Sequence, residues 1–272
     1  MAELPASRPR LVATDLDGTL LHSDGTVTAR TRAVLSALDD LGVPVVFTTG
    51  RPIRWMEALW ADVGGHGLAI CSNGGIVYDV AGQQIRTARP VPRSTGLEIA
   101  ERLREAIPGT LLALEHCEGW VSEPTFPHHP DDRSERPRGE LFDVYRDDVV
   151  KILAVHRDLP PEEFWGRVEE LVGHLVTTTW SSSVALVEIS GDGVTKASTL
   201  ATVATDLGIT ADEVIAFGDM PNDLPLLEWA GTSYAMANAH PTVLALADHV
   251  APHNDEDGVA AVLSQLFDLS LG

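Results

Sequence analysis

The stretch Arg10–Gly25, RLVATDLDGTLLHSDG, decides the fold of this chain. A short apolar run leads directly into Asp15 and Asp17, and Gly18-Thr19 then turns the chain away. Two carboxyl groups at the end of a buried strand are costly unless a positive group balances their charge. The stretch therefore predicts a site that uses two acids and holds a cation close to them.

The composition is that of an ordinary globular protein with a strongly acidic balance. The chain has 272 residues, of which 44% are hydrophobic and 22% charged, enough for one large domain or two small ones. Forty acidic residues against 19 basic ones give a formal net charge of −21. Because such a surface repels polyanions, we expect neither nucleic acid nor a membrane as a partner. An anionic substrate would need a local cation.

Cysteine usage and the N-terminal stretch favour a cytoplasmic protein. Cys71 and Cys117 lie far apart and form no CxxC motif, so we expect no disulfide framework. No long apolar segment follows Met1–Arg10, so we expect no signal peptide. No stretch approaches the roughly 18 apolar residues of a membrane span. Both a monomer and a homodimer remain compatible with the sequence.

Strands and helices alternate at both ends of the chain. Four apolar runs near the N-terminus predict strands, at residues 11–14, 43–48, 68–71 and 76–78. Amphipathic patterns between them predict one helix from Thr28 to Gly42 and another from Pro52 to Val63. The alternation returns after Thr195. Unbroken apolar strands between amphipathic helices predict a parallel sheet that is covered on both faces.

The pattern changes between these two halves. Alternating strands and two helices indicate an α+β unit with hairpins, and residues 122–140, rich in proline and charge, predict an exposed loop. The strands are expected at residues 111–114, 149–155 and 184–189, and the helices at 95–106 and 161–175. We therefore expect a discontinuous α/β core, residues 1–84 and 190–272, with an inserted α+β cap domain, residues 85–189.

Polar residues stand at the ends or edges of the core elements. They are Asp15 and Asp17 after the first strand, Thr49, Gly50 and Arg51 after the second, Lys196 at the start of a helix, and GDMPND, Gly218–Asp223, after a later strand. Ligands of open parallel sheets bind beyond the carboxyl ends of the strands, where neighbouring loops converge. We therefore expect these distant pieces to meet in one site.

The residue types of this set suit phosphoryl transfer. Several carboxylates a few ångströms apart stay ionised only beside a cation, and Mg²⁺ suits hard oxygen ligands best. One acid of the Asp15/Asp17 pair can attack phosphorus while the other handles protons. Lys196 is the local cation that an anionic substrate requires, and Thr49 and the loop amides can bond the remaining phosphoryl oxygens.

Four segments resemble the signature motifs of the haloacid dehalogenase-like superfamily of phosphohydrolases, in order and in spacing: DLDGTLL, TTGR, GVTKAS and GDMPNDLPLLEWAG. The segments SNGGIVYD and YAMANAHPTVLALADHV resemble its Cof-like branch, whose members are mostly phosphatases of sugar phosphates and related compounds. The resemblance covers about Arg10–Gln83 and Gly191–Phe267. It implies a Rossmann-like parallel-sheet core with an inserted α+β (C2-type) cap.

The resemblance also implies a role for each motif residue. Asp15 would be the nucleophile that forms an aspartyl-phosphate, and Asp17 would be the general acid for the leaving oxygen and then the base for water. Thr49 and Lys196 would hold the phosphoryl group. The ligands and supports of Mg²⁺ would be Asp15, the Asp17 carbonyl, Asp219, Asn222 and Asp223.

The sequence is compatible with two roles for each of two further residues. Arg51 can bind substrate or pair with a nearby acid, and Asn73 can hold a turn or contact substrate. The candidate substrate-binding set is therefore Thr49, Gly50, Arg51, Asn73, Lys196 and Asn222.

We therefore predict a Mg²⁺-dependent phosphatase of small phosphorylated metabolites, with a cap that closes over the core and selects the leaving group. A phosphotransferase or phosphomutase would share the aspartyl-phosphate and differ only in its acceptor. A non-catalytic phosphometabolite-binding protein would not need both Asp15 and Asp17. The sequence leaves the substrate open.

Overall fold

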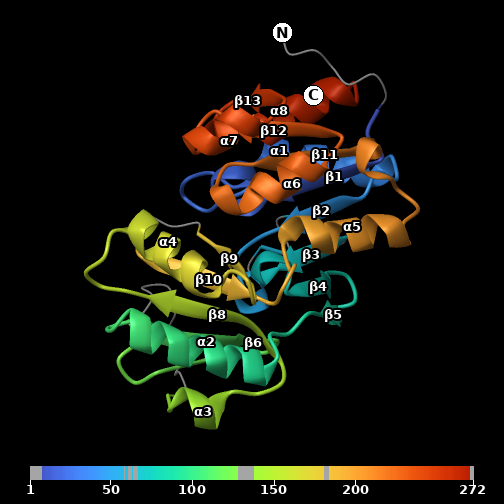
Figure 1. The fold of residues 1–272 in the computed structure, drawn as a ribbon. Helices are drawn as coiled ribbons and strands as arrows, with labels where there is room; N and C mark the ends of the chain where they lie inside the picture. Colours follow the sequence, from blue (N-terminus) through green and yellow to red (C-terminus); the bar gives the residue numbers. More distant parts are fainter. Residues whose placement is uncertain are drawn as a thin grey trace.

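The computed structural model describes residues 8–57, 59, 60, 63, 67–127, 138–180 and 184–269. These residues form two β-sheets with their helices, one in the upper and one in the lower half of Figure 1. Residues 128–137 of the predicted loop, and residues 1–7 of the N-terminal stretch, lie outside this range. Among the described residues, no helix combines the length and apolar composition that a membrane crossing requires.

The larger sheet forms the predicted core. Its strands are β1 (Leu11–Asp15), β2 (Val45–Thr48), β3 (Leu68–Cys71), β4 (Ile76–Asp79), β5 (Gln84–Ala88), β11 (Val214–Gly218), β12 (Thr232–Met236) and β13 (His249–Ala251). In space they follow the order β13-β12-β11-β1-β2-β3-β4-β5. Neighbouring strands from β13 to β3 are parallel, so the predicted parallel sheet is confirmed.

The last two strands of this sheet are antiparallel. Between β3 and β4, Ser72 and Asn73 have φ angles of 52° and 54°, and Gly74 has a φ of 106°. Left-handed backbone of this kind reverses the chain over a few residues, and asparagine and glycine adopt it most readily. The turn therefore joins β3 and β4 as a hairpin and carries Asn73 to the carboxyl end of β3.

Every residue of the central strands β1 and β11 is buried. The larger sheet is therefore covered on both faces. The core helices are α1 (Ala29–Asp40), α5 (Lys196–Asp206), α6 (Leu224–Trp229), α7 (Pro241–Leu246) and α8 (Gly258–Leu266). α1 packs on α8, and α5 packs on α6. Thr28 is the N-cap residue of α1, as predicted, since its side chain accepts a hydrogen bond from the Thr31 amide.

The second helix expected near the N-terminus differs from its prediction. The described residues after Pro52 form a 3₁₀ turn at Ile53–Trp55 and single turns beyond it. Met56, Trp60 and Val63 are nevertheless buried on one side, as their spacing predicts. The apolar stripe therefore packs against the core without forming one regular helix over the described positions.

The smaller sheet is antiparallel throughout. Its strands are β6 (Leu111–His116), β7 (Trp120–Ser122), β8 (Val149–Val155), β9 (Thr177–Thr179) and β10 (Leu186–Ser190), in the spatial order β7-β6-β8-β10-β9. Its helices are α2 (Arg93–Ala106), α3 (Leu141–Val144) and α4 (Pro161–Val172). The predicted α/β core with an inserted α+β unit is thus confirmed. We call this inserted unit, β6–β10 with α2–α4, the cap; the boundaries at residues 84/85 and 189/190 stay a prediction.

Alternation along the cap strands gives the sheet two different faces. On one face, Leu112, Ile152 and Val187 join a buried apolar cluster with residues of α2 and α4. Their sequence neighbours therefore point to the other side of the sheet. That second face, which carries Lys151 and Glu188, is turned toward the core.

Candidate active site

The predicted polar residues converge at the carboxyl edge of the larger sheet. β11, β1 and β2 are neighbours, and Asp15 at the end of β1 is level with Thr48 at the end of β2. Thr49 follows β2 directly, and Asp219 follows β11. Lys196 is the first residue of α5. Residues as far apart in the chain as Asp15 and Asp219 thus reach one edge, as a parallel sheet dictates.

Lys196 lies between two buried acids. Its Nζ donates hydrogen bonds of 2.7 Å to Oδ1 of Asp15 and of 2.7 Å to Oδ1 of Asp223. All three side chains are buried. Burial by itself lowers the pKa of the Lys196 ammonium, but the two carboxylates raise this pKa overall, so Lys196 stays charged. It is the cation that the opening stretch of sequence requires.

Asp219 brings a third carboxyl group to this cluster. Thr19 Oγ1 donates a 2.8 Å hydrogen bond to its Oδ1. Carboxylate oxygens of Asp15, Asp219 and Asp223 lie within 4.8 Å of one another. Burial raises the pKa of Asp15 well above its ordinary value, and burial and the nearby Asp223 raise the pKa of Asp219 to about 7. One ammonium does not balance three carboxylates, so the cluster is suited to a second cation.

Gly18 lets the loop after β1 pass close to Asp219. Its φ is +72°, and a Cβ at this position would lie 2.3 Å from Asp219 Oδ2. Asn238 Nδ2 fixes the loop by donating a 2.7 Å hydrogen bond to the Gly18 carbonyl. Both the backbone angle and the lack of space require glycine here.

Asp17 lies outside the buried cluster and pairs with Arg51. Arg51 Nε donates a 2.7 Å hydrogen bond to Asp17 Oδ2, and Nη2 donates to Oδ1. The Asp17 side chain is 56% exposed and faces the entrance of the site. Of the two interpretations of Arg51, the structure shows the pairing with an acid.

Hydrogen bonds connect three polar residues beside the cluster: Thr49, Asn73 and Asn222. Thr49 Oγ1 accepts a 3.0 Å hydrogen bond from the Arg51 amide, and the Asn73 amide donates one of 3.0 Å to the Thr49 carbonyl. Asn222 Nδ2 donates to Asn73 Oδ1 at 3.1 Å, and Asn73 Nδ2 donates to Thr179 Oγ1 of the cap at 3.2 Å. Asn73 therefore holds a turn and also links the core to the cap.

The cap contributes charged residues that the sequence analysis did not assign to the site. Lys151 is buried, and its Nζ donates to the Gly50 carbonyl at 2.7 Å and to Glu188 Oε1 at 2.6 Å, and lies 2.9 Å from Glu115 Oε2. Burial alone lowers the pKa of Lys151, but the two glutamates raise it overall. Arg54 of the core donates to Glu115 Oε1 at 2.8 Å. A charged residue inside an apolar run, as in VVKILAV, is the signal that points to such a network.

A cavity of about 840 Å³ opens between the two sheets. Asp15 and Asp17 line its core end, and Glu115, Lys151 and Glu188 line its cap side. A molecule in this cavity would therefore contact the predicted nucleophile and the cap at once.

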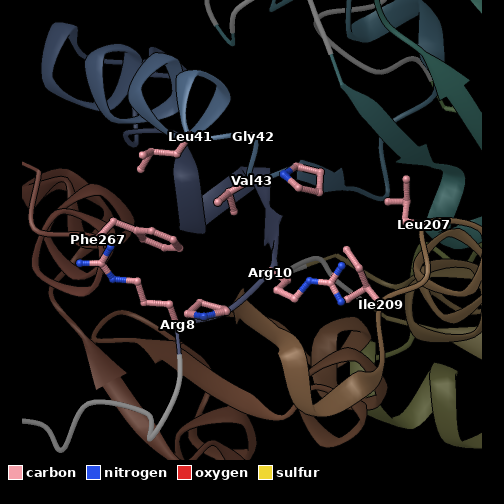
Figure 2. A pocket seen from close by; sticks show the side chains of 10 residues that line it. Arg8, Arg10, Leu41, Gly42, Val43, Leu207, Ile209 and Phe267 are labelled. Atoms are coloured by element: carbon pink, nitrogen blue, oxygen red, sulfur yellow. The ribbon is translucent and has the colours of Figure 1, made fainter.

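A second pocket, of about 520 Å³, lies at the opposite edge of the larger sheet (Figure 2). In Figure 2, Arg8 lies beside Phe267. Arg8 pairs with Asp268, and Arg10 pairs with Glu213. Because its arginines are paired with acids and it lies at the amino ends of the strands, this pocket does not resemble the substrate sites of open parallel sheets.

A comparison with models of protein families identifies the family of this chain. The family model of the haloacid dehalogenase-like hydrolases matches residues 12–263. The chain belongs to this family. The match includes all four motif segments and the inserted cap, so the membership predicted from the motifs, and with it a hydrolase, is confirmed.

Three relatives that match nearly the whole chain are named as phosphatases. The chain is 28% identical to the 5-amino-6-(5-phospho-D-ribitylamino)uracil phosphatase of Bacillus subtilis strain 168, over 97% of this chain and 99% of the relative. It is 29% identical to the pyridoxal phosphate phosphatase of Escherichia coli K12, over 92% and 96% of the two chains. It is 31% identical to the HMP-PP phosphatase of Serratia proteamaculans, over 93% and 94%.

Solved structures of the family share this architecture. A haloacid dehalogenase-like hydrolase from Bacteroides thetaiotaomicron superposes with a TM-score of 0.76 at 26% identity, over 96% of this chain and all of that one. A family member from Bacillus subtilis superposes with a TM-score of 0.80 at 23% identity, over 94% and 99% of the two chains, and supports the fold alone. The core and the inserted cap therefore form one family fold.

Proposed function

We propose that this protein is a Mg²⁺-dependent phosphatase of small phosphorylated metabolites that forms an aspartyl-phosphate on Asp15. The observation that carries the proposal is the buried contact of Lys196 with Asp15 and Asp223, beside Asp219, at the carboxyl edge of the sheet. Three relatives of nearly full length are named as phosphatases of phosphorylated small molecules, which supports the same reaction.

The acidic cluster fits a divalent cation. We assign Asp15 and Asp219 as its side-chain ligands, with the Asp17 carbonyl beside them. Asp223 is better suited to support, because Lys196 occupies its Oδ1 and the amides of Asp219 and Met220 donate to its Oδ2. Asn222 supports this loop through Asn73. When bound, Mg²⁺ would neutralise part of the charge on the phosphoryl oxygens.

The proposed reaction has two steps. A carboxylate oxygen of Asp15 bonds to phosphorus, the ester P–O bond breaks, and Asp17 gives its proton to the leaving oxygen. Asp17 then takes a proton from water, the water oxygen bonds to phosphorus, and Asp15 is released with inorganic phosphate. Lys196 keeps positive charge beside Asp15 throughout, and we assign Thr49 and the Gly50 loop to the remaining phosphoryl oxygens.

Arg51 has to move during this cycle. Asp17 cannot donate a proton while both of its oxygens accept hydrogen bonds from the Arg51 guanidinium. A phosphoryl group that enters between Asp15 and Arg51 offers the guanidinium an alternative planar, bidentate partner. We assign Arg51 to substrate binding on this ground, in exchange for its contact with Asp17.

Magnesium is expected to stabilise the folded protein, and more so at pH 8 than at pH 5.5. Asp219, with a pKa raised from 3.8 to about 7, favours folding while it is protonated, and this contribution is lost as the pH rises from about 4 through 7. At pH 8 Mg²⁺ takes the place of the proton, and at 100 times its Kd it adds about 3 kcal/mol. Thermal unfolding with Mg²⁺ and with EDTA measures this difference. Asp219→Asn should remove most of it, and an equal Mg²⁺ effect in this variant would contradict the assignment.

Gly18→Ala is expected to lower kcat/KM by about 100-fold, because the new Cβ displaces Asp219. Gly25→Ala is the matched control, since Gly25 has a φ of +80° and no atom within 4 Å of the added Cβ. Both variants carry the backbone cost of a left-handed alanine, about 1 kcal/mol in unfolding free energy. Equal activities in the two variants would mean that the close approach of Gly18 to Asp219 has no role in the reaction.

The experiment that tests the proposed function is phosphate release over a panel of sugar phosphates, nucleotides and cofactor phosphates, with Mg²⁺ and with EDTA. Mg²⁺-dependent release from at least one ester supports a phosphatase. Accumulation of phosphorylated Asp15 without phosphate release, relieved by an added sugar, would instead indicate a phosphotransferase. Tight binding without any phosphorylation of Asp15 would overturn the catalytic proposal.

A further inference from the structure

Lys151 reaches from the cap to the core loop that we assign to the phosphoryl group. It lies on β8, and its Nζ donates a 2.7 Å hydrogen bond to the Gly50 carbonyl. The same Nζ lies 2.6 Å from Glu188 Oε1 and 2.9 Å from Glu115 Oε2. An ammonium has three N–H donors, and these three oxygens use all of them. Lys151 lines the cavity, but it keeps no donor for a substrate, so we look for its role in the Gly50 loop.

A buried network fixes the position of this ammonium. Glu115, which pairs with Lys151, also accepts a 2.8 Å hydrogen bond from Arg54 Nη1 at its other oxygen. The guanidinium carbon of Arg54 lies 5.4 Å from the ring centroids of both Trp55 and Trp120. A buried polar network in which every group has a partner is rigid, because any displacement leaves a charge without a partner. The ammonium therefore keeps one place against the core.

The peptide unit between Gly50 and Arg51 transmits this position to Thr49. A trans peptide is planar, so its carbonyl and its N–H point in opposite directions. The carbonyl of this unit accepts the hydrogen bond from Lys151, and its N–H donates one of 3.0 Å to Thr49 Oγ1. A donor that fixes the carbonyl end therefore also fixes the direction of the N–H at the other end.

Gly50 makes the loop sensitive to this contact. A Cβ at position 50 would lie only 3.2 Å from Asn73 Oδ1 and 3.5 Å from Glu188 Oε2, so there is little room for a larger residue. Glycine also has the widest choice of backbone conformations. Without the ammonium of Lys151, the peptide unit after Gly50 can turn, and its N–H then leaves the Thr49 hydroxyl.

The contact with the Arg51 N–H leaves the proton of the Thr49 hydroxyl available. A hydroxyl has one O–H donor and two acceptor lone pairs, and the N–H occupies one lone pair. Within the described part of the chain, no group accepts a hydrogen bond from this hydroxyl. Its proton therefore remains for a phosphoryl oxygen.

We propose that Lys151 is a positioning residue that holds the Gly50–Arg51 peptide so that the Thr49 hydroxyl donates to the phosphoryl group. Docking of the cap thus completes the phosphoryl-binding loop of the core. The proposal rests on the proposed function, because it takes Thr49 as a ligand of the phosphoryl group.

A charge-balanced variant removes the contact without leaving an unpaired charge. Lys151→Met/Glu188→Gln takes away one positive and one negative group, and Glu115 keeps Arg54. We expect kcat/KM to fall about 10- to 100-fold, which corresponds to one hydrogen bond to a charged group. Val168→Ala is the control for a less stable cap, because Val168 is buried in the apolar cluster of the cap and does not line the cavity. It should keep nearly the wild-type kcat/KM, and an equal loss in this control would overturn the proposal.

A double-mutant cycle with Thr49→Val tests the route through the hydroxyl. Valine has the shape of threonine without the hydroxyl. If Lys151 acts through this group, Lys151→Met/Glu188→Gln should change kcat/KM by no more than about twofold once residue 49 is valine. A merely structural role would give the same loss with threonine and with valine, and that result would contradict the proposal.

Inorganic phosphate separates positioning from recognition of the leaving group. It has no leaving group, so its Kd, measured by calorimetry with Mg²⁺, reports on the phosphoryl site alone. We expect Lys151→Met/Glu188→Gln to weaken phosphate binding about tenfold, and to lower kcat/KM by one common factor for all hydrolysed esters. An unchanged phosphate Kd, or losses that differ from ester to ester, would instead make this pair a contact of the leaving group and overturn the proposal.

The phosphate measurement also separates this proposal from the proposed function. If no ester is hydrolysed, but phosphate binding depends on Lys151 only while Thr49 is present, the positioning role stands and the phosphatase proposal fails. If esters are hydrolysed with Mg²⁺, but the effects of the Lys151 and Thr49 substitutions are independent, the phosphatase proposal stands and the positioning role fails.

Discussion

Asp15→Asn is expected to reduce Mg²⁺-dependent phosphate release by about 10⁴-fold or more. An amide neither attacks phosphorus as a carboxylate does nor serves as an equal ligand for Mg²⁺. Because Asn has almost the same volume as Asp, the fold should persist. Phosphate release with each hydrolysed ester measures the effect, and circular dichroism checks the fold. Turnover that survives in a preparation free of wild-type enzyme would mean that Asp15 is not the nucleophile.

Asp17→Asn is the comparison that separates the nucleophile from the proton carrier. With p-nitrophenyl phosphate, whose leaving group needs little protonation, this variant should still form the aspartyl-phosphate. Hydrolysis of that intermediate should be slow, because no base activates water. We therefore expect a burst of p-nitrophenol and a protein with 80 Da added in intact-mass spectra, about one phosphoryl group on Asp15. Loss of the burst would assign Asp17 to an earlier step.

Lys196→Met is expected to destabilise the fold by about 3–5 kcal/mol and to abolish turnover. The substitution leaves Asp15 and Asp223 without the ammonium that lies 2.7 Å from each of them. Buried carboxylates without a partner are among the most costly groups in a folded protein. Urea unfolding measures the loss of free energy, and phosphate release measures the loss of activity. A variant as stable as the wild type would contradict the assigned role of Lys196 in charge balance.

The double variant Lys196→Met/Asp223→Asn distinguishes charge balance from catalysis. Removing the charge of Asp223 should recover part of the lost stability, since one unpaired carboxylate disappears. Turnover should stay absent, because Lys196 also holds the phosphoryl group. Recovery of activity together with stability would show that Lys196 acts through the fold alone.

The core and the surroundings of the predicted nucleophile could be predicted from the sequence. An apolar run that ends in DLDGT predicts a buried strand followed by a tight turn, and β1 with its Gly18 turn has this form. Lys196 starts its helix, as the local pattern predicts, and the Thr28 cap expected for the first helix is present. These predictions succeeded because strand burial, capping and left-handed turns depend on residues close together in the chain.

Only the tertiary structure decided which partner each charged group has. Arg51 pairs with Asp17, and Asn73 links Asn222 to Thr179 of the cap. Neither pairing follows from spacing, because the partners belong to loops that the sheet order brings together. The same holds for Lys151, which has its partners on β6, β10 and the loop after β2.

The sequence by itself determined a parallel core, an inserted cap and the residue types of a phosphoryl-transfer site, because these follow from periodicity and from motifs at strand ends. The cavity between the core and the cap was decided by tertiary structure. Alternation shows which cap residues share a face, but only the docking of the cap on the core shows that this face lies above Asp15. The docking depends on contacts between segments about 100 residues apart, such as Lys151 with Gly50, and local patterns carry no information on them.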